Sequence, residues 1–165
     1  MATTAPQIQI HHDKEHLTAA QRFGEVISLA IMVLVIAYFR QLWTMQAGFF
    51  TPAFGPWEQF WFFAPLIFGL AAPLVRVVVG RRNPARPCEI ATDLAMVIGA
   101  IWLWRVFPFD FSHLGDALPG NLPALFSWVP DWVGRVVLLL QAFGGAIALI
   151  VTTAQFVKAS LRDWV

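Results

Sequence analysis

The chain has 165 residues, of which 58% are hydrophobic and 13% are charged, and its formal net charge is +1. Soluble domains carry about 25% charged residues, so the composition excludes an ordinary soluble domain and fits lipid, where an ionised side chain at the bilayer centre costs roughly 2.5–3.5 kcal/mol. The basic residues are spread along the chain rather than gathered in a patch, so we predict no nucleic-acid partner.

The N-terminal stretch 1–24 is polar and lacks the basic start and early apolar run of a signal peptide. We expect it to be a cytoplasmic tail that leads into a first helix near Thr18. Within it, His12 and His16 would share one helix face at the spacing of metal ligands. Because no third ligand is evident, both remain candidates only, and we predict no metal site.

Four apolar segments follow, each close to the length that crosses about 30 Å of hydrocarbon. They are residues 25–45, 56–80, 89–107 and 131–157. Each is apolar around its whole circumference, which is typical of helices that face lipid. The sequence therefore predicts an all-α, integral membrane four-helix bundle over 25–157, followed by a cytoplasmic tail at 158–165.

The basic residues outside these segments gather on one side of the predicted membrane. They are Lys14, Arg22, Arg81, Arg82, Arg86, Lys158 and Arg162. Cytoplasmic loops carry an excess of Lys and Arg. We therefore expect both termini and the loop 81–88 in the cytoplasm, and the loops 46–55 and 108–130 on the outer side.

Aromatic residues are concentrated at the predicted outer boundary. Seven of the eight tryptophans fall there, namely Trp43, Trp57, Trp61, Trp102, Trp104, Trp128 and Trp132, and Trp164 falls at the inner boundary. An interfacial aromatic belt explains them, and a docked partner or pigment is the alternative. The outer loop 108–130 mixes apolar residues with proline and glycine, so we expect short helical turns in the interface that cap the bundle or contact a neighbouring subunit.

Ionisable residues lie at the cytoplasmic ends of three segments: Glu25, Arg76, Glu89 and Asp93. Asp93 follows Glu89 by four residues, which places both on one helix face. Asp93 and Arg76 lie at similar depth, which favours an ion pair between them. A proton or cation pathway is the alternative, because ionisable groups inside a membrane are functional candidates.

The outer ends hold a second set of charges: Arg40, Glu58, Arg105, Asp110, Asp131 and Arg135. Arg135 follows Asp131 by four residues, so the two can pair on one helix face. Arg40 and Glu58 face each other across the first outer loop. We predict a ring of interfacial ion pairs that fixes helix packing, with an anion or headgroup site, or an ion vestibule, as alternatives.

Small residues indicate where helices approach one another in lipid. Ala95 and Gly99 lie in the third segment, and the fourth contains Ala142, Gly144, Gly145 and Ala146. We predict that these faces pack the third segment against the fourth, with a homo-oligomer contact as the alternative. Pro65 and Pro73 predict a kink in the second segment.

No catalytic motif is present: the chain has no phosphate-binding glycine loop, no HExxH and no GxSxG. No histidine lies within a segment, which disfavours haem inside the bundle. We therefore predict that the protein is not an enzyme and has no cofactor. A pigment or haem at the periphery, near His113, is the alternative.

The stretch WRVFPFDFSHL at 104–114, with the proline-rich loop and last span that follow, resembles a group of small prokaryotic membrane proteins to which no activity is attached. The resemblance covers roughly the second to fourth spans. It implies a four-span protein of the bacterial inner membrane.

The sequence as a whole favours a non-catalytic membrane subunit or scaffold that assembles through its helix faces and aromatic outer surface. Its expected partners are the lipid bilayer and further copies or other membrane subunits. One alternative is a small oligomeric transporter or channel that uses Asp93, Glu25 and Arg76. Another is an accessory subunit of a redox or photosynthetic membrane complex.

Overall fold

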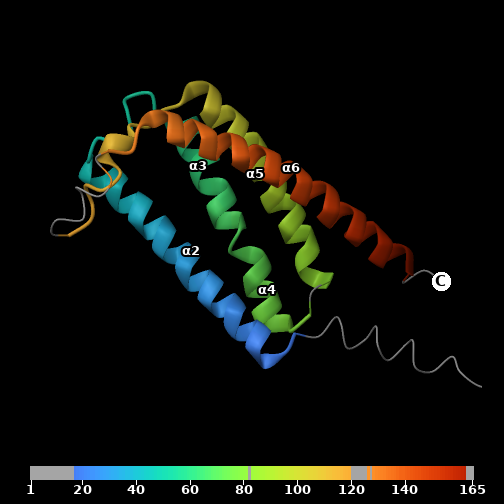
Figure 1. The fold of residues 1–165 in the computed structure, drawn as a ribbon. Helices are drawn as coiled ribbons and strands as arrows, with labels where there is room; N and C mark the ends of the chain where they lie inside the picture. The colour runs from blue at the N-terminus through green and yellow to red at the C-terminus, as the bar shows by residue number, and fades with distance from the viewer. Residues whose placement is uncertain (1–16, 82, 120–125, 127, 163–165) are drawn as a thin grey trace, which may run out of the picture.

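The computed structural model describes residues 17–81, 83–119, 126 and 128–162, and these residues form a helical protein (Figure 1). The helices are α2 (Ala19–Met45), α3 (Pro56–Phe68), α4 (Ala71–Val79), η1 (Asn83–Ala85), α5 (Arg86–Val106), η2 (Phe111–His113) and α6 (Asp131–Arg162). Four stretches are long and apolar enough to cross a membrane: Ala19–Met45, Pro56–Val79, Asn83–Val106 and Asp131–Leu161. The predicted all-α class with four apolar helices of spanning length is confirmed.

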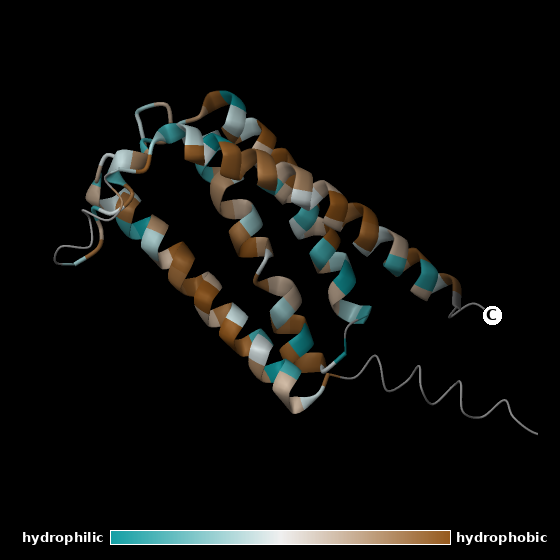
Figure 2. Ribbon diagram, in the orientation of Figure 1, coloured by the Kyte–Doolittle hydropathy of each residue, from teal (hydrophilic) through white to brown (hydrophobic). Residues whose placement is uncertain are grey.

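The helices are longer than the apolar segments because polar residues at the ends of the segments are helical too. Helix α2 begins after Thr18, whose side chain accepts a hydrogen bond from the Gln21 N–H while the Gln21 side chain accepts one from the Thr18 N–H. This capping box satisfies two N–H groups that the first turn leaves free. Figure 2 shows the same pattern along the chain, with hydrophobic residues in the middle of the helices and hydrophilic ones nearer their ends.

The second span is interrupted rather than continuous. Helix α3 ends at Phe68 and α4 begins at Ala71. Pro73 has no N–H, so the Gly69 carbonyl loses its usual helical partner at this point. The predicted kink is confirmed, and Pro73 explains where the helix is interrupted.

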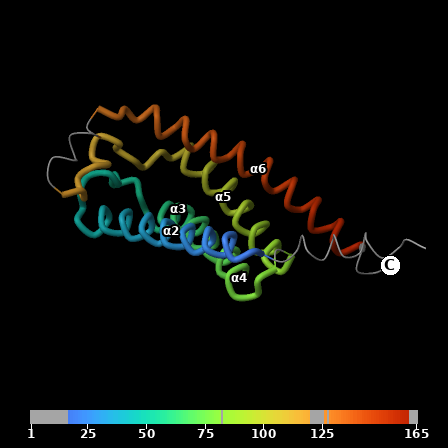
Figure 3. The backbone as a smooth tube through the Cα atoms, turned by 60° about the horizontal axis from the view of Figure 1, so that its bottom comes forward, coloured from blue at the N-terminus to red at the C-terminus, as the bar shows by residue number. Residues whose placement is uncertain are grey.

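The helices pack in chain order rather than all against one another. Helix α5 packs against α6 on one side and against α3 on the other, and α2 packs mainly against α4. Figures 1 and 3 show α6 running beside α5, away from α2. Helices α2 and α6 therefore lie at opposite sides of the molecule.

The core lies at the end that the sequence predicts to face outward, where two loops cover the helices. Its buried residues are Leu42, Phe49, Phe54, Ala100, Leu103, Phe109 and Leu138. The loops are joined by backbone hydrogen bonds from the Thr51 N–H to the Pro108 carbonyl, 3.1 Å, and from the Asp110 N–H to the Phe49 carbonyl, 2.8 Å. The described part of the loop 108–130 therefore caps the helices, which is one of its two predicted roles; contact with a neighbouring subunit stays a prediction. Residues 120–125 and 127 lie outside the described residues.

Candidate functional site

An arginine joins three helices at the predicted cytoplasmic end. Arg76 of α4 places Nη1 3.0 Å from Oε1 and 3.2 Å from Oε2 of Glu25 on α2. Its Nη2 contacts the carboxylate of Glu89 on α5. The three side chains are mostly buried, with 24%, 18% and 23% of Arg76, Glu25 and Glu89 exposed. The cluster ties α2, α4 and α5 together.

Local helix structure positions this cluster. Gly80 ends α4 in the left-handed conformation, with φ of 71°, which glycine adopts without steric cost. Arg76 thereby lies in the last turn of α4, while Glu89 lies in the first turn of α5. A cation at a helix C-terminus and an anion at an N-terminus are both favoured by the helix dipole. Helix polarity therefore reinforces the ion pair between them.

The predicted pair between Asp93 and Arg76 is wrong. Among the described residues no ion pair joins them, because Glu89, one turn closer to the start of α5, occupies the guanidinium instead. Asp93 faces α6, where its Oδ2 accepts a hydrogen bond from the Thr152 hydroxyl at 3.4 Å. The two acids of α5 therefore have separate partners on different neighbouring helices.

The predicted ring of outer ion pairs is also wrong. No ion pair connects Arg40, Glu58, Arg105, Asp110, Asp131 and Arg135 to one another in the part of the chain that the structure describes. The acids accept hydrogen bonds from N–H groups instead. Glu58 accepts from the Trp102 indole at 3.1 Å, and Asp131 accepts from the Phe111 backbone at 2.9 Å.

Two further outer residues have partners that the charge pattern did not indicate. The Arg135 guanidinium lies 4.2 Å from the centre of the Phe107 ring rather than on Asp131, a cation–π arrangement. Asp110 accepts hydrogen bonds from the Ser112 N–H and hydroxyl. Short carboxylates at loop and helix starts meet unpaired backbone donors first, which explains why these acids do not reach the arginines.

His113 lies close to two aspartates. His113 places Nδ1 2.8 Å from Asp116 Oδ2 and Nε2 3.9 Å from Asp110 Oδ2. Within the described residues, no group of three or more His, Cys, Asp or Glu side chains could hold a metal ion. His12 and His16 lie outside the described residues.

The small residues divide between two contacts. Gly145 of α6 faces Met96 and Val97 of α5, where an added Cβ would stand 3.0 Å from each. This contact agrees with the predicted packing of the third segment against the fourth. Ala95 and Ala142 are likewise covered, the first buried and the second packed against the core, whereas Ala146 is partly exposed.

Gly99 has a different role from the one predicted. An added Cβ there would stand 2.6 Å from the Trp61 carbonyl oxygen, so Gly99 lets α5 approach α3 rather than α6. Pro65 lies four residues after Trp61 and has no N–H to donate to that carbonyl. The spacing of Trp61 and Pro65 identifies the free carbonyl in the sequence, but not the glycine that meets it.

Gly144 is the exception among the small residues of α6. An added Cβ at Gly144 would meet no atom within 4 Å. The helix face around it is apolar and uncovered by the rest of the described chain.

Comparison with protein-family models, with curated proteins and with solved structures found no match for this chain.

Proposed function

We propose that this protein is a non-catalytic integral membrane subunit, which assembles with further copies or other membrane subunits through uncovered helix faces. The outward face of α6 carries the proposal. Leu140, Phe143 and Ile147 are exposed by 66%, 69% and 64%, and they surround Gly144, which has open space beside it. A small residue flanked by large apolar ones is the surface through which helices associate in lipid.

The pairing of the charged residues supports this role. Arg76 lies between Glu25 and Glu89, so these three groups hold helices together. The pairing compensates the cost of placing each charge near hydrocarbon. Charged residues that are paired in this way support a structural role in a subunit rather than a continuous polar path for ions.

We further propose a multi-pass arrangement in the cell membrane, with both tails and the loop 81–88 in the cytoplasm. The excess of basic residues near these segments supports this orientation. The resemblance of residues 104–114 and the segments after them to prokaryotic membrane proteins supports a bacterial inner membrane. Labelling of Cys88 in intact cells by a thiol reagent that does not cross membranes would contradict the orientation.

Gly144→Leu tests the proposed assembly. We expect it to weaken association at least tenfold, because the added side chain prevents close approach of a second helix. Gly24→Leu is the matched control, since Gly24 on α2 also has no atom within 4 Å of an added Cβ. The measurement is the size and composition of the protein extracted from its own membrane in mild detergent. A wild-type protein that is monomeric and free of partners would refute the proposal.

A small cation transporter is the second candidate, and Asp93 is the observation that favours it. Its carboxylate has a 3.4 Å hydrogen bond to Thr152 and no ion pair among the described residues. In a transporter, Asp93→Asn should reduce proton or cation flux into liposomes more than tenfold while folding is retained. In a subunit, the same change affects only stability or assembly. Equal fluxes for the two proteins would exclude Asp93 as a transport residue.

A further inference from the structure

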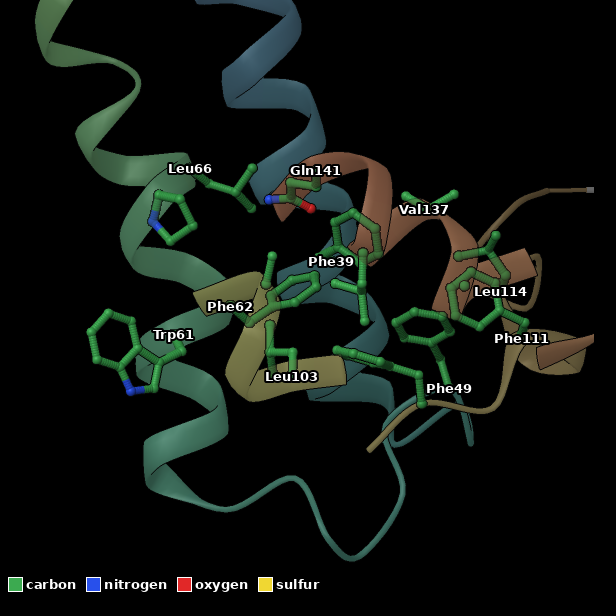
Figure 4. Close-up of a pocket in the computed structure, with 15 residues that line it drawn as sticks. Phe39, Phe49, Trp61, Phe62, Leu66, Leu103, Phe111, Leu114, Val137 and Gln141 are labelled. Atoms are coloured by element: carbon green, nitrogen blue, oxygen red, sulfur yellow. The ribbon is translucent and has the colours of Figure 1, made fainter. Parts of the chain in front are cut away.

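A cavity of about 240 Å³ lies among the helices toward the predicted outer end. Its walls are aromatic and aliphatic, with residues from α2, α3, α5, α6 and the outer loops (Figure 4). Figure 4 shows which of the labelled residues lie at each end of the cavity. Phe49 and Phe111 lie at one end, and Leu66 and Gln141 lie at the other.

The cavity is closed by rings at the outer end and bordered by a half-exposed residue on α6. The centre of the Phe49 ring lies 5.5 Å from that of Phe109 and 5.4 Å from that of Phe111, so these rings pack into a continuous cover. Val137 lines the cavity and is 52% exposed. Phe39 of α2 also lines it, although α2 and α6 are not among the helix pairs that pack closely. The entrance therefore lies beside α6, on the side that lipid would cover.

Among the described lining residues, Gln141 carries the only amide side chain, and the indole N–H of Trp61 is the only other polar side-chain group. The Gln141 amide makes no hydrogen bond with any part of the chain that the structure describes. Gln141 lies ten residues after Asp131, the first residue of α6, which corresponds to about 15 Å of helix, or roughly half the thickness of the hydrocarbon. An amide without a partner is costly at that depth, so a ligand with a polar group is favoured there.

We propose that this cavity binds the ring of a neutral, lipid-soluble carbonyl compound of the quinone type, with the Gln141 amide donating a hydrogen bond to the carbonyl. A cavity of about 150 Å³ lined by Leu, Ile and Phe binds benzene, so the larger volume here has room for a substituted ring. Aromatic walls favour offset or edge-on packing of such a ring. Leu140, Phe143, Gly144 and Ile147 of the proposed assembly face are not among the lining residues, although Val137 at the entrance lies two turns before Gly144 on the same side of α6.

The chemistry of the walls excludes other occupants. The lining residues that the structure describes include no charged side chain, so a charged headgroup would lose its hydration without gaining a partner among them. These residues also include no His, Met or Cys, and so no axial ligand for haem iron. The proposed site at Gln141 differs from the alternative of a pigment beside His113, whose Nδ1 lies 2.8 Å from Asp116 Oδ2.

Binding of decyl-1,4-benzoquinone to the full chain in lipid nanodiscs tests this proposal. Quenching of tryptophan fluorescence reports binding, because Trp61 lines the cavity. We expect saturable binding, weakened about fivefold to tenfold by Gln141→Leu, which removes one hydrogen bond but keeps the size of the side chain. Decylbenzene has no carbonyl group, so Gln141→Leu should leave the affinity of decylbenzene for the cavity unchanged. That affinity is measured by competition with the quinone, using the quinone affinity of each variant.

A substitution at the entrance provides the second readout. Val137→Phe should weaken binding at least tenfold by narrowing the opening, while the partial exposure of Val137 leaves space for the larger ring without disturbing the fold. Val136→Phe is the matched control, since Val136 is the same residue type on the same helix, is 42% exposed and is not among the lining residues. Quenching that does not saturate, or equal binding by wild type, Gln141→Leu and Val137→Phe, would overturn the proposal.

Discussion

Gly99→Ala should lower the free energy of unfolding by about 2–3 kcal/mol, because an added methyl group has no space between α5 and α3. The new Cβ would stand 2.6 Å from the Trp61 carbonyl oxygen. That oxygen belongs to the backbone and cannot rotate away as a flexible side chain would, so the two helices must separate. The measurement is reversible unfolding in mixed micelles with increasing denaturing detergent.

Gly24→Ala, in α2, is the control for this prediction. It makes the same chemical change in a membrane-length helix, but no atom lies within 4 Å of the added Cβ. We expect no loss of stability, and a gain of up to about 1 kcal/mol from the better helix propensity of alanine. Equal destabilisation by the two substitutions would show that the contact between Gly99 and Trp61 does not limit helix packing.

Arg76→Gln should cost about 3 kcal/mol of unfolding free energy, since removing one member of a buried charge cluster leaves the others uncompensated. Glu25 and Glu89 would then share a largely buried site without a cation. Arg76→Lys should give an intermediate loss, because one ammonium group cannot fork between two carboxylates as a guanidinium does. Thermal unfolding in detergent micelles measures both changes.

A rescue experiment separates charge from packing at this cluster. Adding Glu25→Gln and Glu89→Gln to the Arg76→Gln variant removes the uncompensated charge while keeping side chains of similar size. We expect most of the lost stability to return, because neutral groups avoid the cost of burying unpaired carboxylates. If the triple variant were no more stable than Arg76→Gln alone, the loss would come from packing rather than charge.

The local features of the helices were largely predictable. The apolar length of each segment indicates a spanning helix, the polar lead-in predicts a first helix near Thr18, which begins at Ala19, and Pro65 and Pro73 predict the irregular second span that α3 and α4 form. Each of these depends on residues within about one turn or one segment. Neighbouring helices are not needed to explain them.

The partners of the polar residues were less predictable. Depth along the helix axis suggested Asp93 as the partner of Arg76, but the structure pairs Arg76 with Glu25 and Glu89. Asp131 similarly accepts from a loop N–H instead of pairing with Arg135. Depth is a one-dimensional coordinate, whereas an ion pair also requires that both residues point into the same gap between helices.

Hydropathy and proline act within a single helix, so the amino-acid sequence alone predicts an all-helical chain with four apolar segments and a kinked second segment. The contact of Gly99 with Trp61, the open space beside Gly144 and the place of Gln141 in an apolar cavity follow instead from how the helices pack. These outcomes depend on the rotation of each helix about its own axis and on which helix lies beside it. Helices that are apolar all round carry little information about that rotation.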